Sequence, residues 1–160
     1  MKKNERTIEL LNDLIRINKD RIEGYEKVAG DGQAITPDIR NFFYTMSTES
    51  RSFVNDLHAE VLRLGGVPVS GSTISGKLYL FWLDMKSKIL ERAAGNDAYS
   101  LLTAGEAGED TVQKAYQHAL DPGNGLPDNI FRLIEKQEIR LRRSYALMKR
   151  YRDEYMVASK

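Results

Sequence analysis

Apolar residues recur at spacings of three, four and seven along most of the chain, which is the pattern of amphipathic helices. The pattern predicts long helices over about 5–29, 38–64, 97–120 and 129–155, and a shorter, more uniformly apolar helix over about 76–92. No segment alternates between apolar and polar residues as a half-buried strand would. The sequence therefore predicts an all-α protein.

The ends of these segments carry residues that commonly start and stop helices. Gly30 and Gly32 follow the first helix, where glycine often terminates a helix. Before the second helix, Thr36 can accept hydrogen bonds from the free N–H groups of the first turn, and Pro37 suits the first helical position. The run "DPGNGLPD" separates the last two long helices.

The four long helices are matched in length, at roughly 35 to 40 Å by the rise per residue, so they can lie side by side. Short connections should make the first and second helices, and the third and fourth, antiparallel neighbours. Residues 65–96 are enough to travel the length of the bundle, with the short helix inside this crossover. A single long crossover is typical of ferritin-like connectivity. We therefore expect residues 1–160 to form one ferritin-like four-helix-bundle domain.

A resemblance to a known family supports this fold. The stretches that carry it are "NDLIRINKDRIEGYEKV", "SRSFVNDLHAEVLRLGGVP", "GEAGEDTVQKAYQHAL" and "LPDNIFRLIEKQ". They resemble the successive helices of an uncharacterised bacterial family of ferritin-like four-helix-bundle proteins, a domain of unknown function. The resemblance runs from about Thr7 to Asp153 and is most specific at "LGGVP" and "GEDTVQKAYQHAL". It implies the fold, and it implies no particular activity, substrate or metal.

Composition removes several classes of function. The chain has 160 residues and no cysteine, which excludes disulfides, thiolate catalysis and zinc sites built on cysteine. Its net charge of +1 gives no overall attraction to nucleic acid or to an anionic membrane. The N-terminal residues are too charged for a signal peptide, and no stretch is long and apolar enough to span a membrane. We expect a cytoplasmic protein that contacts neither nucleic acid nor a membrane.

A pair of metal ions is the first chemistry to look for in a ferritin-like bundle. Such a site takes a glutamate from each of two helices and Glu-x-x-His from each of the other two. His58 is preceded three positions earlier by Asn55, and His118 by Ala115, so neither histidine completes the motif. The sequence therefore offers no conventional set of metal ligands.

Carboxylates alone also bind iron or manganese when enough of them converge. The candidates nearest the predicted helix contacts are Glu26, Glu49, Glu106, Glu109, Glu135 and Glu138. Glutamates three positions apart are also common on solvated helix faces, and most charged side chains stay in water. The six residues therefore have a metal-binding and a purely structural interpretation.

Polar residues interrupt the apolar stripes at comparable depths in the bundle. They are Asn18, Glu49 and Gln137. Buried polar groups usually find hydrogen-bond partners and thereby fix the register of neighbouring helices. The alternative is a small-ligand pocket in the core, which Tyr25, Tyr116 and Tyr145 would line unless their hydroxyls donate to the amides.

Two surfaces have the composition of a contact site. The segment 77–90 is more apolar than one bundle face requires, so it either binds a second chain or plugs one side of the bundle. The last helix is basic around "RLRR", whereas the preceding helix is acidic. This charge either contacts phosphate groups or pairs with the neighbouring helix.

Two functional hypotheses from different classes follow. The first is a non-enzymatic bundle protein, without a cofactor, that acts through helix surfaces as a homo-oligomer or with a protein partner. It expects the glutamates to face water and Trp82 to be buried between chains. The second is a carboxylate-ligated iron or manganese protein with an oxidase or iron-handling role, which needs at least about four of the glutamates in one central cavity.

Overall fold

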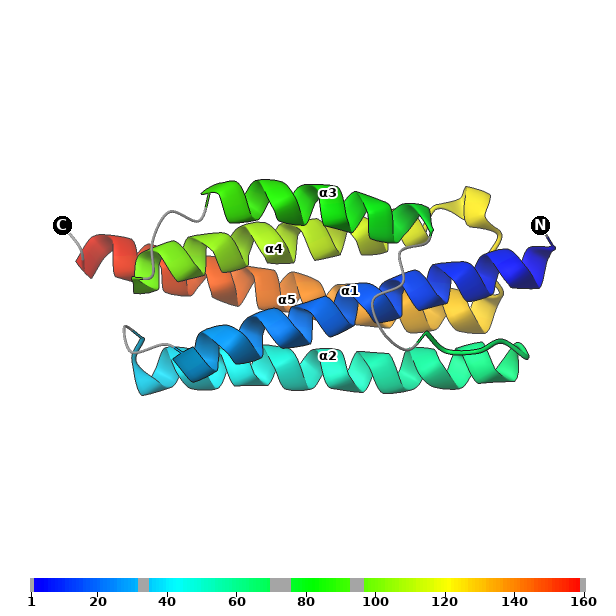
Figure 1. Cartoon of the computed structure of the whole chain (residues 1–160), viewed down its shortest axis with the longest axis horizontal. Helices are drawn as coiled ribbons and strands as arrows, with labels where there is room; N and C mark the ends of the chain where they lie inside the picture. The colour runs from blue at the N-terminus through cyan, green and yellow to red at the C-terminus, as the bar shows by residue number, and fades with distance from the viewer. Residues whose placement is uncertain (1, 32–34, 70–75, 93–96, 159–160) are drawn as a thin grey trace.

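The computed structural model describes residues 2–31, 35–69, 76–92 and 97–158, and these residues contain helices and no strand (Figure 1). The α-helices are α1 (Lys3–Asp31), α2 (Pro37–Arg63), α3 (Lys77–Arg92), α4 (Ala98–Ala119) and α5 (Asp128–Ala158). A short 3-10 turn, η1 (Pro122–Asn124), precedes α5. The all-α prediction is confirmed. None of the described helices combines the length and the apolar character needed to cross a membrane.

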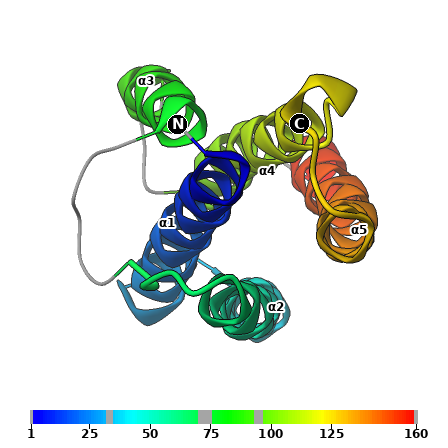
Figure 2. The same cartoon turned by 90° about the vertical axis from the view of Figure 1, so that its right-hand side faces the viewer.

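The four long helices form the expected bundle from two antiparallel pairs. α1 packs against α2 and α4 packs against α5 (Figure 1). α2 and α4 run in the same direction, because α3 travels back along the bundle between them (Figure 1). α3 lies outside the four, against α1 and α4 (Figure 2). The predicted long crossover with a helix inside it is therefore confirmed.

Side-chain caps fix where two of these helices begin. The Thr36 hydroxyl accepts a hydrogen bond from the Ile39 N–H at 3.4 Å, as the sequence predicts. The Asp97 carboxylate accepts one from the Ser100 N–H at 2.9 Å. Both caps satisfy an N–H group that has no partner within its helix.

The apolar core has two parts, one in each half of the bundle. One is built around residues such as Leu14, Phe53 and Ile134. The other is built around residues such as Phe43 and Met148. Between the two, each of the four long helices contributes buried polar residues to a central layer.

α3 is attached to α1 by polar contacts as well as by apolar ones. Asp20 Oδ2 accepts hydrogen bonds from the Tyr79 hydroxyl at 3.0 Å and from Trp82 Nε1 at 2.9 Å. Trp82 is only 5% exposed within the single chain. The expectation that Trp82 is buried between chains is therefore wrong, because this side of the 77–90 segment packs onto its own bundle. Leu80 faces away and is 52% exposed.

The start of α3 is held by a carboxylate from another helix. Asp13 Oδ2 accepts a hydrogen bond from the Tyr79 N–H in the first turn of α3, at 3.3 Å. Gly76 precedes this turn with φ of +81°, and an added Cβ there would lie 1.9 Å from Asp13 Oδ2. Glycine is therefore required both by the backbone conformation and by the approach of the carboxylate.

We predict that Gly76→Ala detaches the start of α3. Gly65→Ala is the matched control, because Gly65 has φ of +80° and nothing within 4 Å of an added Cβ. The control should lose about 1–2 kcal/mol of stability from backbone strain alone. Gly76→Ala should lose clearly more and should shift the emission of Trp82, the only tryptophan in the chain, toward that of water-exposed indole. Equal losses in chemical denaturation, with unchanged emission, would show that the Asp13 contact does not hold α3.

Candidate functional site

A buried arginine occupies the middle of the bundle. Arg21 of α1 is 4% exposed, and its guanidinium forms two hydrogen bonds to the carboxylate of Glu109 on α4, at 2.9 and 2.6 Å. From α2, Glu49 Oε1 accepts a further bond at 3.1 Å and the Ser50 hydroxyl accepts one at 2.8 Å. The Met46 carbonyl oxygen accepts another at 3.2 Å. Residues of α2 and α4 therefore surround one cation that α1 supplies.

A chain of amides and hydroxyls extends this layer to α5. Ser50 donates to Asn18 Oδ1 at 2.8 Å, and Asn18 Nδ2 donates to the Tyr116 oxygen at 2.9 Å. The Tyr116 hydroxyl donates to Gln137 Oε1 at 2.6 Å. Gln137 Nε2 completes the chain by donating to the Phe53 carbonyl at 3.4 Å. The prediction that Asn18 and Gln137 find hydrogen-bond partners in the core is confirmed.

The electrostatics of the layer keep Arg21 charged. Burial alone would lower the pKa of Arg21, but the charge and hydrogen bonds of Glu109 outweigh it and hold the pKa above its usual value. Burial raises the pKa of Tyr25, whose ring lies 5.5 Å from the Arg21 guanidinium carbon, and the negative charge of Glu109 raises it further. Burial also raises the pKa of Tyr116. At neutral pH the layer therefore contains an arginine that keeps its proton and tyrosines that keep theirs, which suits structure rather than proton transfer.

The predicted metal-binding glutamates occupy different parts of the molecule. Glu109 and Glu49 meet at Arg21, and Glu49 also accepts a hydrogen bond from Ser144 of α5 at 2.9 Å. Its second oxygen lies 3.7 Å from Arg140. The structure therefore brings two of the six glutamates together, around a cation supplied by the chain.

The other four glutamates lie elsewhere. Glu26 pairs with Arg51 on the α1–α2 surface, and Glu106 pairs with Arg152 of α5. Across the described part of the chain, no three acidic or histidine side chains are grouped closely enough to hold a metal ion.

The last two candidates, Glu135 and Glu138, lie three positions apart on α5. Glu138 is 5% exposed and pairs with Arg142 at 3.0 Å, whereas Glu135 faces solvent. Of the basic residues of α5, Arg152 pairs with the acidic preceding helix as predicted, whereas Arg140 pairs with α2 and Arg142 with α5 itself.

Comparison with known proteins supports the fold. The model of a domain of unknown function, DUF2383, matches residues 6–122. The chain belongs to the DUF2383 family. No curated protein matches the sequence.

Two solved structures are similar to this DUF2383 chain. One is the bacterioferritin-related protein from Bacteroides fragilis, described as a dodecameric thioferritin, at a TM-score of 0.76 and 15% identity, covering 99% of this chain and 90% of that one. The other is from a study of ferritin-like diiron-carboxylate proteins from Bacillus anthracis str. Ames, at a TM-score of 0.66 and 17% identity, covering 94% and 96%. At these identities the likeness establishes the ferritin-like fold.

The central residues of this chain do not fit a pair of metal ions. A di-metal site in this fold needs inward glutamates on all four helices and two histidines. Here α1 supplies Asn18 and Arg21, and α5 supplies Gln137 and Ser144. Only Glu49 and Glu109 have the right chemistry, and both are bound to the guanidinium. The layer therefore has its positive charge built into the chain.

The sequence pattern pointed to Asn18, Glu49, Glu109 and Gln137 but not to Arg21. A charged residue is rarely buried, so composition gave no reason to place Arg21 inside. The position of Arg21 in the sequence did give a reason to place it inside. Leu14, Asn18, Arg21 and Tyr25 follow one another at spacings of four, three and four. Arg21 thus belongs to the stripe that faces the core.

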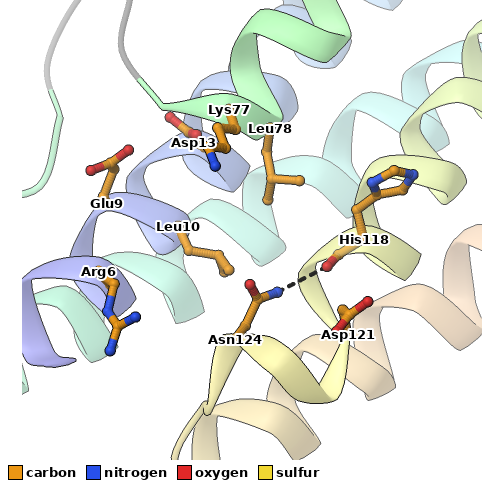
Figure 3. A pocket seen from close by; sticks show the side chains of 9 residues that line it. All are labelled: Arg6, Glu9, Leu10, Asp13, Lys77, Leu78, His118, Asp121 and Asn124. Carbon is orange, nitrogen blue, oxygen red and sulfur yellow. Dashed lines mark hydrogen bonds between the residues drawn. The ribbon is translucent and has the colours of Figure 1, made fainter.

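A second group of charged residues surrounds a pocket at the end of the bundle (Figure 3). Its volume is about 560 Å³, and it lies between the beginnings of α1 and α3 and the end of α4. The lining residues are Arg6, Glu9, Leu10, Asp13, Lys77, Leu78, His118, Asp121 and Asn124. Both signs of charge are present, so the pocket presents no dominant field to a charged ligand.

Asp13 in this pocket has an unusual proton affinity. Burial raises its pKa to about 6, although the Tyr79 N–H and the nearby Arg16 guanidinium favour the charged form. Its carboxylate lies 3.0 Å from Arg16 Nη1. The folded protein therefore binds this proton more tightly than the unfolded chain does.

We predict that Asp13 makes stability depend on pH between about 4 and 6. Its contribution, of about 3 kcal/mol, is fully present below the unfolded pKa and is lost as pH rises through the folded value. The free energies of unfolding of wild type and Asp13→Asn should therefore diverge with pH, wild type losing stability relative to the variant as pH rises. Parallel pH curves for the two proteins, or a carboxyl carbon of Asp13 that titrates near its usual pKa by NMR, would contradict this account.

Proposed function

We propose that this protein is a non-enzymatic ferritin-like bundle that acts through its outer helix surfaces, by assembly with copies of itself. The observation that carries the proposal is the Arg21 guanidinium between Glu49 and Glu109. These carboxylates are already neutralised and hydrogen-bonded, so they have little to offer a metal ion. A centre of this kind supports the fold and leaves the surface to carry the activity.

The surface formed by α2 and α5 is the best candidate for the contact. α3 covers α1 and α4 on one side of the bundle, whereas α2 and α5 lie away from it (Figure 2). Large apolar side chains on these two helices that remain exposed are Tyr44, Leu62, Ile139, Leu147 and Met156. We propose that these exposed apolar side chains contribute to a contact between chains. The dodecameric assembly described for the similar protein from Bacteroides fragilis supports a homo-oligomer.

A second candidate is the carboxylate-ligated iron or manganese protein. Its support is the likeness to diiron-carboxylate proteins and the inward position of Glu49 and Glu109. It requires Arg21 to leave the two carboxylates when metal binds. Such a movement would transfer a buried charge out of its hydrogen bonds, at a cost of several kcal/mol.

One preparation tests both candidates. Protein purified without chelator should elute as an oligomer by light scattering, and the same peak should contain far less than about one metal ion per chain. Leu147→Lys should reduce the mass toward that of the monomer, because it places a charge in the proposed α2–α5 contact.

Leu80→Lys is the matched control on α3, because Leu80 is also exposed and lies in the 77–90 segment. It should leave the mass unchanged. Loss of assembly with Leu80→Lys alone would place the contact on α3 instead. Monomeric wild type would refute the proposed assembly, and stoichiometric iron or manganese that Glu49→Ala removes would favour the metal protein.

A further inference from the structure

An apolar pocket lies beside the central ion pair, between α1 and α4. Its volume is about 230 Å³. Val28 and the Tyr25 ring line it from α1, and Leu101 and Val112 line it from α4. Phe43 of α2 contributes a second ring, which stacks on Tyr25 with centroids 5.5 Å apart and planes at 22°. All the residues that line the pocket belong to one chain.

Glycines on the two facing helices create this space. Gly24 of α1 and Gly108 of α4 both line the pocket, and an added Cβ at either position would meet nothing within 4 Å. Glycine inside a helix costs about 1 kcal/mol relative to alanine. Gly105, one turn earlier, is different, because an added Cβ there would lie 2.9 Å from the side chain of Met148. Close packing thus explains Gly105 and leaves Gly24 and Gly108 unexplained.

The charged groups that border the pocket already have partners. Arg21 and Glu109 are paired with each other. Asp20 accepts hydrogen bonds from Trp82 and Tyr79, and its carboxylate lies 3.7 Å from Lys86 Nζ. The described lining therefore offers no buried unpaired charge to a ligand. An apolar space of roughly 150 Å³ accepts a single aromatic ring in another protein.

We propose that this pocket binds a small uncharged ligand with about one or two apolar rings. Its volume suits a ligand of that size, somewhat larger than a single ring. The walls favour apolar rings, because the side chains of Val28, Leu101 and Val112 give the space an aliphatic border and Trp82 adds an aromatic one. The paired charges around it disfavour an ionised ligand, because such a ligand would lose its hydration without gaining a partner.

Toluene is a suitable probe, with full-length protein and the emission of Trp82 as the readout, because this single tryptophan borders the pocket. Wild type should bind toluene saturably and show a raised unfolding midpoint. Gly108→Leu fills the pocket and should weaken binding by at least about tenfold. Gly30→Leu is the matched control, because Gly30 is also in a helix and also has open space at its Cβ, but does not line the pocket. It should bind as wild type does.

Further variants and a charged probe keep the result unambiguous. If Gly108→Leu does not fold, Gly24→Ala/Gly108→Ala removes part of the space and should also weaken binding. Benzoate, which adds a charge to a similar ring, should bind at least about tenfold more weakly than toluene. The proposal is overturned if wild type shows no saturable binding up to the solubility of toluene, or if the pocket variants bind as tightly as wild type. Tighter binding of benzoate than of toluene would overturn the ligand class.

Discussion

The ion pair between Arg21 and Glu109 is the interaction on which the rest of the bundle depends. It joins α1 to α4, the two helices that also carry α3. Glu49 and Ser50 bring α2 to the same guanidinium, and Ser144 connects α5 through Glu49. Arg21 of α1 therefore contacts α2 and α4 directly, and α5 is linked to it through Glu49. Above and below it, the two apolar clusters close the layer off from water.

Burying these charges costs desolvation energy, which only close pairing and complete hydrogen bonding can offset. The layer meets both conditions, because Arg21 donates to Glu109, Glu49, Ser50 and the Met46 carbonyl. A buried polar residue can specify the register of packed helices. Here a helix that slid by a turn would separate the charges, so the layer specifies the register of the four helices. In metal-binding members of this fold, metal ions and their ligands join the helices at the centre; here the chain itself supplies the cation.

Much of this architecture could be predicted from the sequence, because the period of the apolar residues and the helix caps are local signals. The crossover followed from the length of the segment between the second and third long helices. The burial of Trp82 against its own bundle could not be predicted in this way. Nothing in the local sequence shows that the Asp20 carboxylate lies within hydrogen-bond distance of the Trp82 indole. Arg21 and Glu109 are 88 residues apart, so only the assembled fold brings them together. The same holds for the pocket, where single helix glycines gain meaning only when Gly24 and Gly108 face one space.

The most direct test of this account is chemical rescue of Arg21→Ala. The variant should be destabilised by about 3–5 kcal/mol, because Glu109 is left buried without its partner. Ethylguanidinium at millimolar concentration restores the atoms that the substitution removes, so it should raise the unfolding midpoint of the variant and leave wild type unchanged. Manganese at the same concentration should have much less effect, because Asn18 and Gln137 stand where a metal pair needs carboxylates. If manganese stabilises the variant and ethylguanidinium does not, the centre is a metal site that Arg21 only blocks, and the account is wrong.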